Sequence, residues 1–262
     1  MTLANGRKAI FITGAASGMG RETALLFARQ GWFVGAHDVN LAGLQALQLE
    51  IGDGNGIFAT LDVTDREAFA AAIARFGDET GGTLDVMFNN AGIAVAGLFD
   101  ELAWEDIISV INVNLLGVMI GIRAAIPLLK ATPGSLCLTT SSSSAIFGTA
   151  GIATYSATKH AVRGLTEALS IEFMRHGVRV ADLLPGLIDT PILSASVKAM
   201  APPDGMWRLT PPSEVADAVW AAYHGDKLHW YVPEELKAFD LQVTAEPEVV
   251  RAERAALAAF RQ

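Results

Sequence analysis

Short apolar runs alternate along the chain with longer segments whose apolar residues recur at helical spacing. Most of the short runs are almost continuously apolar, as expected for parallel strands that are buried on both faces. Seven runs predict strands, at Lys8–Thr13, Phe33–Asp38, Gly56–Asp62, Leu84–Asn90, Ser135–Thr140, Arg179–Pro185 and Leu228–Pro233. Six longer segments predict helices, at Gly20–Gln30, Leu41–Glu50, Asp65–Phe76, Glu105–Lys130, Ala153–His176 and Ser213–His224.

This alternation predicts an α/β fold, a three-layer doubly wound parallel β-sheet with right-handed crossovers and helices on both faces. Thr64 is the expected cap of the third helix, where it completes a capping box with Glu67, and Ser213 is the expected cap of the sixth. No repeat or linker divides the chain, so we expect one domain over residues 1–262. The segment 190–212 carries four prolines between 201 and 212 and predicts a loop over the sheet.

The composition narrows the class of protein. Hydrophobic residues make up 51% of the chain and charged residues 18%, enough for a large core. A net charge of −9 with no basic stripe argues against a nucleic-acid partner. We find no polybasic cluster, no apolar stretch near the roughly 18 residues of a membrane span and no leader pattern, and we therefore expect a cytoplasmic protein with no membrane partner. The single Cys137 lies in an apolar run and predicts a buried, unreactive thiol, and the dispersed histidines predict no metal site.

A glycine-rich turn follows the first predicted strand and opens the first predicted helix. It has the spacing Thr13-Gly14-x-x-x-Gly18-x-Gly20. A pyrophosphate needs close approach to the backbone, and a helix N-terminus offers free N–H groups and a positive dipole end. The turn alone would also fit an ordinary strand-to-helix connection.

Asp38 ends the second predicted strand, 18 residues after Gly20. A carboxylate in this place can accept hydrogen bonds from an adenosine ribose. It would repel the 2′-phosphate of NADP, and no basic residue stands at Ser17, Val39 or Asn40 to compensate. The sequence therefore predicts NAD as the cofactor.

The spacing of the glycine turn resembles the short-chain dehydrogenase/reductase family, in the single-domain subgroup of about 250 residues. Further motifs stand in that family's order, namely Asn89-Asn90-Ala91-Gly92, Asn112-Val113-Asn114-Leu115, Ser142, Tyr155-Ser156-Ala157-Thr158-Lys159, and Pro185-Gly186 followed by Thr190. The resemblance covers about residues 6–233 and implies a Rossmann fold with a hydride transfer between an alcohol and a ketone. The tail 234–262 departs from it, because it lacks the glycine-rich ending that many members use in tetramer packing; its charged, alanine-rich part, 246–262, predicts a helix.

Tyr155 and Lys159 stand four residues apart in a helical pattern, so they share a helix face. A nearby ammonium, together with an oxidised nicotinamide, favours the phenolate, so we expect the pKa of Tyr155 to be lowered. The phenol would then accept the proton of the alcohol, or donate one in the reverse direction. Taken alone, such a pair also occurs by chance on helix surfaces.

The resemblance implies two further catalytic residues. Ser142 lies thirteen residues before Tyr155, the spacing of the serine that hydrogen-bonds the substrate oxygen in family members. It belongs to a run of four serines, 141–144, so its neighbours remain alternatives. Asn114 corresponds to the asparagine that distorts a helix and holds a water of the proton relay in related enzymes.

The resemblance also implies a set of cofactor contacts. Asp62 and Val63 would contact the adenine, Asn90 the adenosine-side ribose region, Ile188 and Thr190 the nicotinamide amide, and Lys159 the nicotinamide ribose. The whole expected set is Gly14, Ser17, Gly18, Met19, Gly20, Asp38, Asp62, Val63, Asn90, Gly92, Tyr155, Lys159, Pro185, Ile188 and Thr190.

The expected substrate side is mostly apolar and predicts a hydrophobic or aromatic secondary alcohol or its ketone. The expected residues are Ser142, Ile146, Phe147, Leu187 and Trp207. Leu193 and Met206 on the loop 190–212 are further candidates. Met206 and Trp207 would equally fit simple packing of that loop on the core. Two alternatives remain open. One is a redox-coupled epimerase or dehydratase of the same fold, and the other is a non-catalytic NAD-binding or scaffold protein.

The predicted helices Glu105–Lys130 and Ala153–His176 are apolar on more than one face, and such helices need a partner besides their own sheet. Family members commonly pair these helices across a two-fold axis, so we expect a homodimer or a homotetramer. The residues that carry this expectation are Ile107, Ile108, Ile111, Leu115, Leu165, Leu169 and Phe173.

Overall fold

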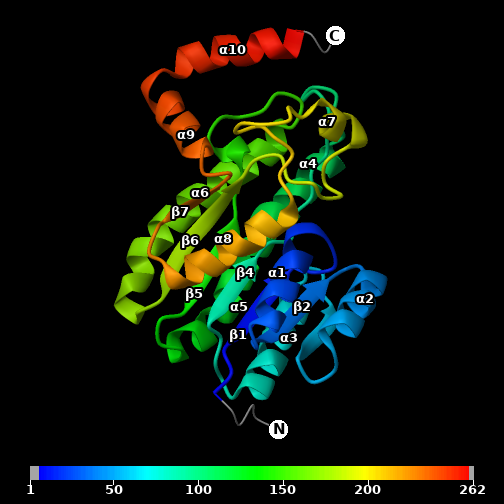
Figure 1. Ribbon diagram of the computed structural model, residues 1–262, viewed down its shortest axis with the longest axis vertical. Coiled ribbons are helices and arrows are strands. Elements are labelled where there is room, and N and C mark those ends of the chain that lie inside the picture. Colours follow the sequence, from blue (N-terminus) through cyan, green and yellow to red (C-terminus); the bar gives the residue numbers. More distant parts are fainter. Residues whose placement is uncertain (1–5, 260–262) are drawn as a thin grey trace.

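The computed structural model describes residues 6–259 and contains one sheet of seven parallel strands in the order β3-β2-β1-β4-β5-β6-β7 (Figure 1). All seven predicted strands are present, with ends shifted by a few residues. Their bounds are β1 Ala9–Thr13, β2 Phe33–Asp38, β3 Gly56–Thr60, β4 Val86–Asn89, β5 Leu136–Thr140, β6 Arg179–Pro185 and β7 His229–Val232. The strand order reverses between β1 and β4, and ligands of open α/β sheets bind beyond the carboxyl ends of the strands at such a point.

Helices cover both faces of the sheet and bury two separate apolar cores. On one face pack α1 (Gly18–Arg29), α2 (Leu41–Ile51) and α8 (Pro212–His224). On the other face pack α3 (Arg66–Thr80), α5 (Gly117–Ala131) and α6 (Ala153–Glu172), with α4 (Trp104–Ile111) continuing into α5. The predicted doubly wound three-layer fold is confirmed.

The predicted helix Glu105–Lys130 is one continuous helical rod, Trp104–Ala131, in which α4 and α5 are joined by a π-helical turn at Asn112–Leu116. An 18-residue window of this rod has a mean hydropathy of 1.8, so the expectation that no apolar stretch approaches the length of a membrane span was wrong. Only 39% of that window is buried in the chain. Length and composition are weak evidence for a span, because core helices of globular proteins share them.

The residues expected to form a partner surface divide into two groups. Ile107 and Phe173 are buried in the chain's own core, so the expectation of a partner surface was wrong for these two, whereas it stays a prediction for the partly buried Ile111, Leu115, Leu165 and Leu169. Ile108 of α4 is exposed, as are Leu116 and Met119 farther along the same rod, Ile171 of α6, and Met174 in the 3-10 turn that follows α6.

Both expected helix caps differ from the structure. Helix α3 is capped by Asp65, whose Oδ1 accepts from the N–H groups of Glu67 and Ala68 at 3.0 and 2.9 Å, while the Thr64 hydroxyl donates to Asp62 at 2.7 Å. Helix α8 begins at Pro212, whose φ suits the first helical position, and it has no side-chain cap because the N-cap residue is Pro211, which has no polar side chain.

Two further helices follow β7, α9 (Leu236–Ala245) and α10 (Pro247–Ala259), so the helix expected in the tail 246–262 is present, with residues 260–262 outside the described residues. Figure 1 shows them at the end of the sheet opposite the N-terminus, which is the end where the strands terminate. A third core joins them to the loops there, with Leu236, Phe239 and Val250 packed beside Ile146 and Leu184. Within the loop 190–212 lies one short exposed helix, α7 (Ala195–Met200).

Candidate active site

The glycine turn between β1 and α1 depends on the absence of side chains. Gly18 has φ +52°, and a Cβ added to it would lie 2.7 Å from Cγ2 of Thr190. A Cβ on Gly20 would lie only 2.2 Å from the carbonyl oxygen of Gly14. The turn is therefore packed tightly against its own backbone and against Thr190 in the loop after β6.

The N-terminus of α1 remains open to a ligand. Ser17 precedes the helix but makes no side-chain cap, and the first turn, which includes Met19, contains no acidic residue. Its N–H groups and positive dipole end are thus available for an anion, and the residues fit a dinucleotide pyrophosphate.

Asp38 lies at the carboxyl end of β2 against this turn. Its Oδ2 accepts from the N–H of Ala16 at 3.0 Å and its Oδ1 from the N–H of Asn40 at 2.9 Å. Each carboxylate oxygen has a second lone pair, so both can still accept from ribose hydroxyls. The position fits the expected adenosine ribose.

Asp62 and Val63, expected at the adenine, follow β3 and differ in exposure. Asp62 is exposed and accepts from the N–H and the hydroxyl of Thr64 at 2.9 and 2.7 Å. Val63 is buried and packs on Gly117, and it lines a small hollow together with Ala91 and Val113.

Asn90 has a structural task that the sequence did not indicate. Its side-chain amide donates to the carbonyl oxygens of Thr13 and Gly14 at 3.0 and 3.2 Å and accepts from the hydroxyl of Thr140 at 3.2 Å. It therefore ties β4 to the glycine turn and to β5. Gly92 is placed between two catalytic candidates, since a Cβ on it would lie 3.3 Å from Oδ1 of Asn114 and 3.7 Å from Nζ of Lys159.

Tyr155 and Lys159 share one face of α6, with Nζ of Lys159 5.5 Å from the centre of the Tyr155 ring. Lys159 is only 2% exposed, and its Nζ donates to the carbonyl oxygen of Thr140 at 2.7 Å. Burial lowers the pKa of Lys159 from 10.5 to about 8. The ammonium is thus still mostly protonated at neutral pH.

The expected lowering of the Tyr155 pKa is not present in the protein alone. Burial raises the pKa of Tyr155 above 10, and a hydrogen bond with Ser142 opposes this only in part. Removal of the phenolate from water therefore outweighs the hydrogen bond with Ser142.

The structure separates the four serines of the run 141–144. Ser142 lies just beyond β5, where its hydroxyl opposes the rise of the Tyr155 pKa, and it accepts from the N–H of Ser144 at 3.1 Å. Ser141 instead donates to the carbonyl oxygen of Lys159 at 3.1 Å, and the Ser144 hydroxyl pairs with that of Thr149 at 3.4 Å. Ser142 is therefore the member of the run that the fold brings to the phenol.

Asn114 is fully buried in the π-helical turn, in line with the expected helix distortion. Its side-chain amide exchanges two hydrogen bonds of 2.9 Å with the backbone of Ile93 and donates weakly to Thr158 at 3.3 Å. Because these hydrogen bonds occupy the side-chain amide, the group that could take part in a proton relay is the main-chain carbonyl of Asn114. A π-helical turn interrupts the regular i to i+4 hydrogen bonds of a helix at this position.

The remaining expected residues lie around the end of β6. Pro185 ends that strand, and Ile188 is buried and pairs with Thr210 across the loop. The expected substrate residues Ile146, Phe147 and Trp207 belong to the third core. Leu187, also expected there, is partly exposed. Trp207 packs edge-on against Phe239 of α9 at 5.3 Å, with the guanidinium of Arg254 4.3 Å from its ring centre, so packing occupies much of its surface.

Thr13 and Thr140 were missed as site residues. The hydroxyl of Thr13 accepts from the N–H groups of Asn90 and Ala91 at 3.0 and 3.1 Å, and the carbonyl of Thr140 holds Lys159. Each is a polar residue at the carboxyl end of a mostly apolar strand, and that position is the signal that would have found them.

Comparison with known proteins decides the family. A model described as short chain dehydrogenase matches residues 8–201. The chain belongs to the short-chain dehydrogenase family. Members of this family are oxidoreductases, and similarity to alcohol dehydrogenases supports alcohol–ketone oxidoreduction.

Relatives with known activities cover most of the chain. It is 37% identical over 216 residues to a cyclohexanol dehydrogenase of Acinetobacter sp., which spans 81% of this chain and 86% of the relative. It is 40% identical over 200 residues to a 2,5-dichloro-2,5-cyclohexadiene-1,4-diol dehydrogenase of Sphingobium indicum, covering 75% and 77% of the two chains. A solved 3-ketoacyl-(acyl-carrier-protein) reductase of Brucella melitensis, complexed with NADH, has a TM-score of 0.78 at 29% identity and covers 86% of this chain and 96% of its own.

Proposed function

We propose that this short-chain dehydrogenase is an NAD-dependent oxidoreductase that transfers a hydride between a secondary alcohol and its ketone. The observation that carries the proposal is the convergence of Tyr155, Lys159 and Ser142 beyond the strand ends, next to an uncapped helix N-terminus. A protein that only binds a dinucleotide needs no acid–base group, so this cluster argues against a scaffold role.

Each residue of the site has its own role in alcohol oxidation. Ser142 hydrogen-bonds the substrate oxygen, and the phenolate of Tyr155 accepts the hydroxyl proton. Lys159, still charged at neutral pH, favours that phenolate against the burial that raises the phenol pKa. NAD, when bound, supplies the hydride acceptor and a positive ring near the phenol. The main-chain carbonyl of Asn114 would hold a water, and that water would carry the proton outward.

Asp38 supports NAD rather than NADP. Its carboxylate is fixed by two backbone N–H groups, so it cannot turn away from a 2′-phosphate. Two charges in close contact repel by about 4 kcal/mol at the effective dielectric near a protein surface, which corresponds to a preference of about a thousandfold.

The substrate proposal is an apolar secondary alcohol on a six-membered ring, or the matching ketone. The apolar side chains of Ile146, Phe147 and Leu187 support it, with Trp207 at the margin. The two related dehydrogenases are named for alcohols on six-carbon rings, cyclohexanol and a dichlorocyclohexadiene diol.

We also propose a cytoplasmic homodimer or homotetramer. The rod Trp104–Ala131 exposes Ile108, Leu116 and Met119, and Ile171 of α6 and Met174 of the 3-10 turn after it are each 73% exposed. An apolar surface of this kind is typical of a subunit interface.

The proposal is tested by incubating the protein with cyclohexanol and other cyclic alcohols in the presence of NAD or NADP, and with the ketones and NADH in reverse. We expect the absorbance of reduced nicotinamide to rise with NAD and an alcohol. Substrate conversion without any net change in NADH would instead identify an epimerase or dehydratase. Binding of NAD without conversion of any alcohol or ketone would favour the scaffold alternative.

A further inference from the structure

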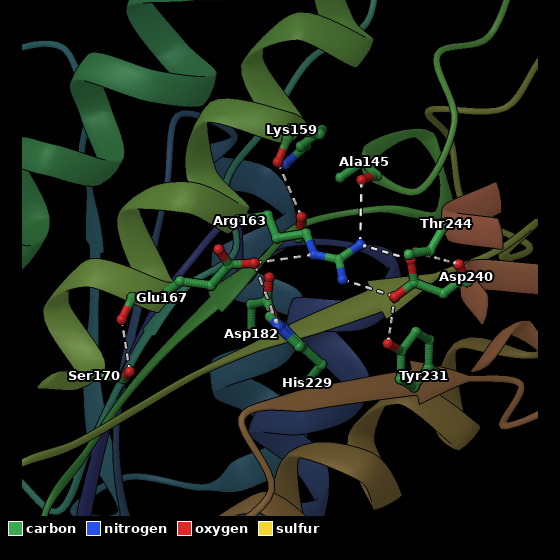
Figure 2. A network of polar contacts seen from close by, with 11 residues as sticks. Ala145, Lys159, Arg163, Glu167, Ser170, Asp182, His229, Tyr231, Asp240 and Thr244 are labelled. Carbon is green, nitrogen blue, oxygen red and sulfur yellow. Dashed lines mark hydrogen bonds and ion pairs between the residues drawn. The ribbon is translucent and has the colours of Figure 1, made fainter. Parts of the chain in front are cut away.

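Arg163 lies on α6 one turn after Lys159, and its guanidinium is at the centre of the polar network in Figure 2. Nη1 and Nη2 donate to the two carboxylate oxygens of Asp240 at 3.1 and 2.7 Å. Nη1 also donates to the carbonyl oxygen of Ala145 at 3.4 Å. One side chain thus joins the catalytic helix, the loop after β5 and helix α9.

The contact with Ala145 reaches the catalytic serine. Ala145 closes the short 3-10 turn that begins after Ser142, and its N–H donates to the carbonyl oxygen of Ser142 at 2.9 Å. The N–H of Ser144, in the same turn, donates to the Ser142 hydroxyl at 3.1 Å. The position of this turn therefore fixes the position of the Ser142 hydroxyl.

Asp240 is itself held in place. The hydroxyl of Tyr231 donates to its Oδ2 at 2.6 Å, and the Asp240 side chain is 14% exposed. Burial alone would raise the pKa of Asp240, but hydrogen bonds from Arg163 and Tyr231 keep it below 3.8. The carboxylate stays charged at neutral pH and provides a planar, two-point contact for the guanidinium.

A second chain of contacts orients the other edge of the guanidinium. Nε of Arg163 lies 3.4 Å from Glu167, which lies 3.6 Å from Nε2 of His229. Nδ1 of His229 is 2.7 Å from Oδ1 of the fully buried Asp182 on β6. The guanidinium is consequently held from both sides, with little freedom to leave Ala145.

We propose that Arg163 is a positioning residue that fixes the Ser142 turn through Ala145, and that Asp240 of α9 holds Arg163 in this orientation. This inference rests on the proposed function, in which Ser142 orients the substrate oxygen. It gives the C-terminal helices, which lie beyond the matched residues 8–201, a part in catalysis. Displacing a reacting group by about 1 Å from a distant position can lower a rate about 100-fold.

The first test is a double-mutant cycle in the full-length protein. Asp240→Asn removes the charge and leaves the size unchanged, and Arg163→Lys keeps the charge but loses the two-point contact. We expect each to lower kcat/KM for the alcohol about 10- to 100-fold, mostly through kcat, with NAD affinity unchanged. In a Ser142→Ala background the same changes should have almost no further effect, because the group on which they act is gone.

Glu234→Gln is the matched control. It breaks the surface ion pair with Lys227, at 3.3 Å, in the segment just before α9. We expect it to leave kcat/KM and its pH dependence unchanged. In Asp240→Asn, by contrast, the pH at which alcohol oxidation becomes fast should move upward, because the Ser142 hydrogen bond lowers the phenol pKa.

A second measurement does not depend on turnover. Hydrogen–deuterium exchange should rise in the peptide 142–147 of Asp240→Asn and Arg163→Lys, and stay unchanged in the glycine turn 13–20. The proposal would be overturned if Asp240→Asn or Arg163→Lys lowered kcat/KM as much in the Ser142→Ala background as in the native protein. Unchanged hydrogen–deuterium exchange over residues 142–147 would also overturn it. A native protein that oxidises no alcohol would refute the proposed function, while the exchange result would still decide whether Arg163 positions the turn.

Discussion

Replacing Lys159 by methionine should stabilise the protein at neutral pH while abolishing most of its activity. Methionine has a similar length and no charge, so it removes the burial of an ammonium that is 2% exposed. Burial lowers the pKa of Lys159 from 10.5 to about 8, a difference that corresponds to about 3 kcal/mol of free energy of unfolding. The lysine is kept for chemistry at the expense of stability.

The sign and the pH window follow from the two pKa values. Between pH 8 and 10.5 the unfolded chain keeps the lysine proton and the folded chain has lost it, so the stability of the native protein rises with pH in this window. Lys159→Met lacks this gain. Its advantage is therefore largest below pH 8 and falls by about 3 kcal/mol by pH 10.5.

One lost contact reduces the advantage at every pH. Nζ of Lys159 donates to the carbonyl oxygen of Thr140 at 2.7 Å, and leaving that buried acceptor unpaired costs about 1–3 kcal/mol. The difference in free energy of unfolding between the two proteins at pH 7 is thus small, and the methionine variant is the more stable. The change of the difference with pH does not depend on this contact, which makes it the quantity to measure.

Urea unfolding of both proteins at pH 7 and at pH 10, followed by circular dichroism, gives the two differences in free energy. The free energies of unfolding of the native protein and the variant should become equal toward pH 10, or the native protein should become the more stable of the two. Parallel stability profiles across this range would show that Lys159 is not titrating with a depressed pKa, and would refute the desolvated lysine on which the reasoning depends.

Three further predictions concern the cofactor, the assembly and the thiol. Asp38→Ala should narrow the gap between NAD and NADP affinities, measured by titration of both cofactors; equal affinities in the native protein would contradict the assignment. Light scattering at micromolar concentration should report at least twice the chain mass of 27.7 kDa, and Ile171→Glu should weaken the assembly; a native monomer would contradict it. Burial raises the pKa of Cys137 to about 12, so iodoacetamide at pH 8 should leave it unmodified by mass spectrometry unless urea is added, and rapid labelling of the native protein would disprove this burial.

The sequence predicted those features that depend on local pattern. Apolar runs located all seven strands, because a parallel strand buried on both faces leaves little room for polar residues. The glycine spacing located the turn at Gly18 and Gly20, where the backbone leaves no space for a Cβ. The predicted cap of α3 was wrong because neighbouring polar side chains compete for this position. Asp65 caps the helix in place of Thr64, and the Thr64 hydroxyl donates to Asp62 instead.

Features that depend on distant contacts could not be predicted. Arg163 and Asp240 are 77 positions apart, and only the docking of α9 brings them together. Burial raises the pKa of Tyr155 and the hydrogen bond with Ser142 opposes that rise, and the sequence shows the serine but not the burial. The same holds for the serine run 141–144, in which the turn after β5 selects Ser142.

The central claim is that Tyr155 is the general acid–base of an NAD-dependent alcohol oxidation. Tyr155→Phe removes one hydroxyl and keeps the ring, so the packing of α6 should remain. With the best cyclic alcohol found for the native protein, we expect turnover to fall by about 10²–10⁴-fold while NAD affinity stays close to that of the native protein. A Tyr155→Phe protein that still oxidises the alcohol at nearly the native rate would show that another group moves the proton, and would contradict this account of the site.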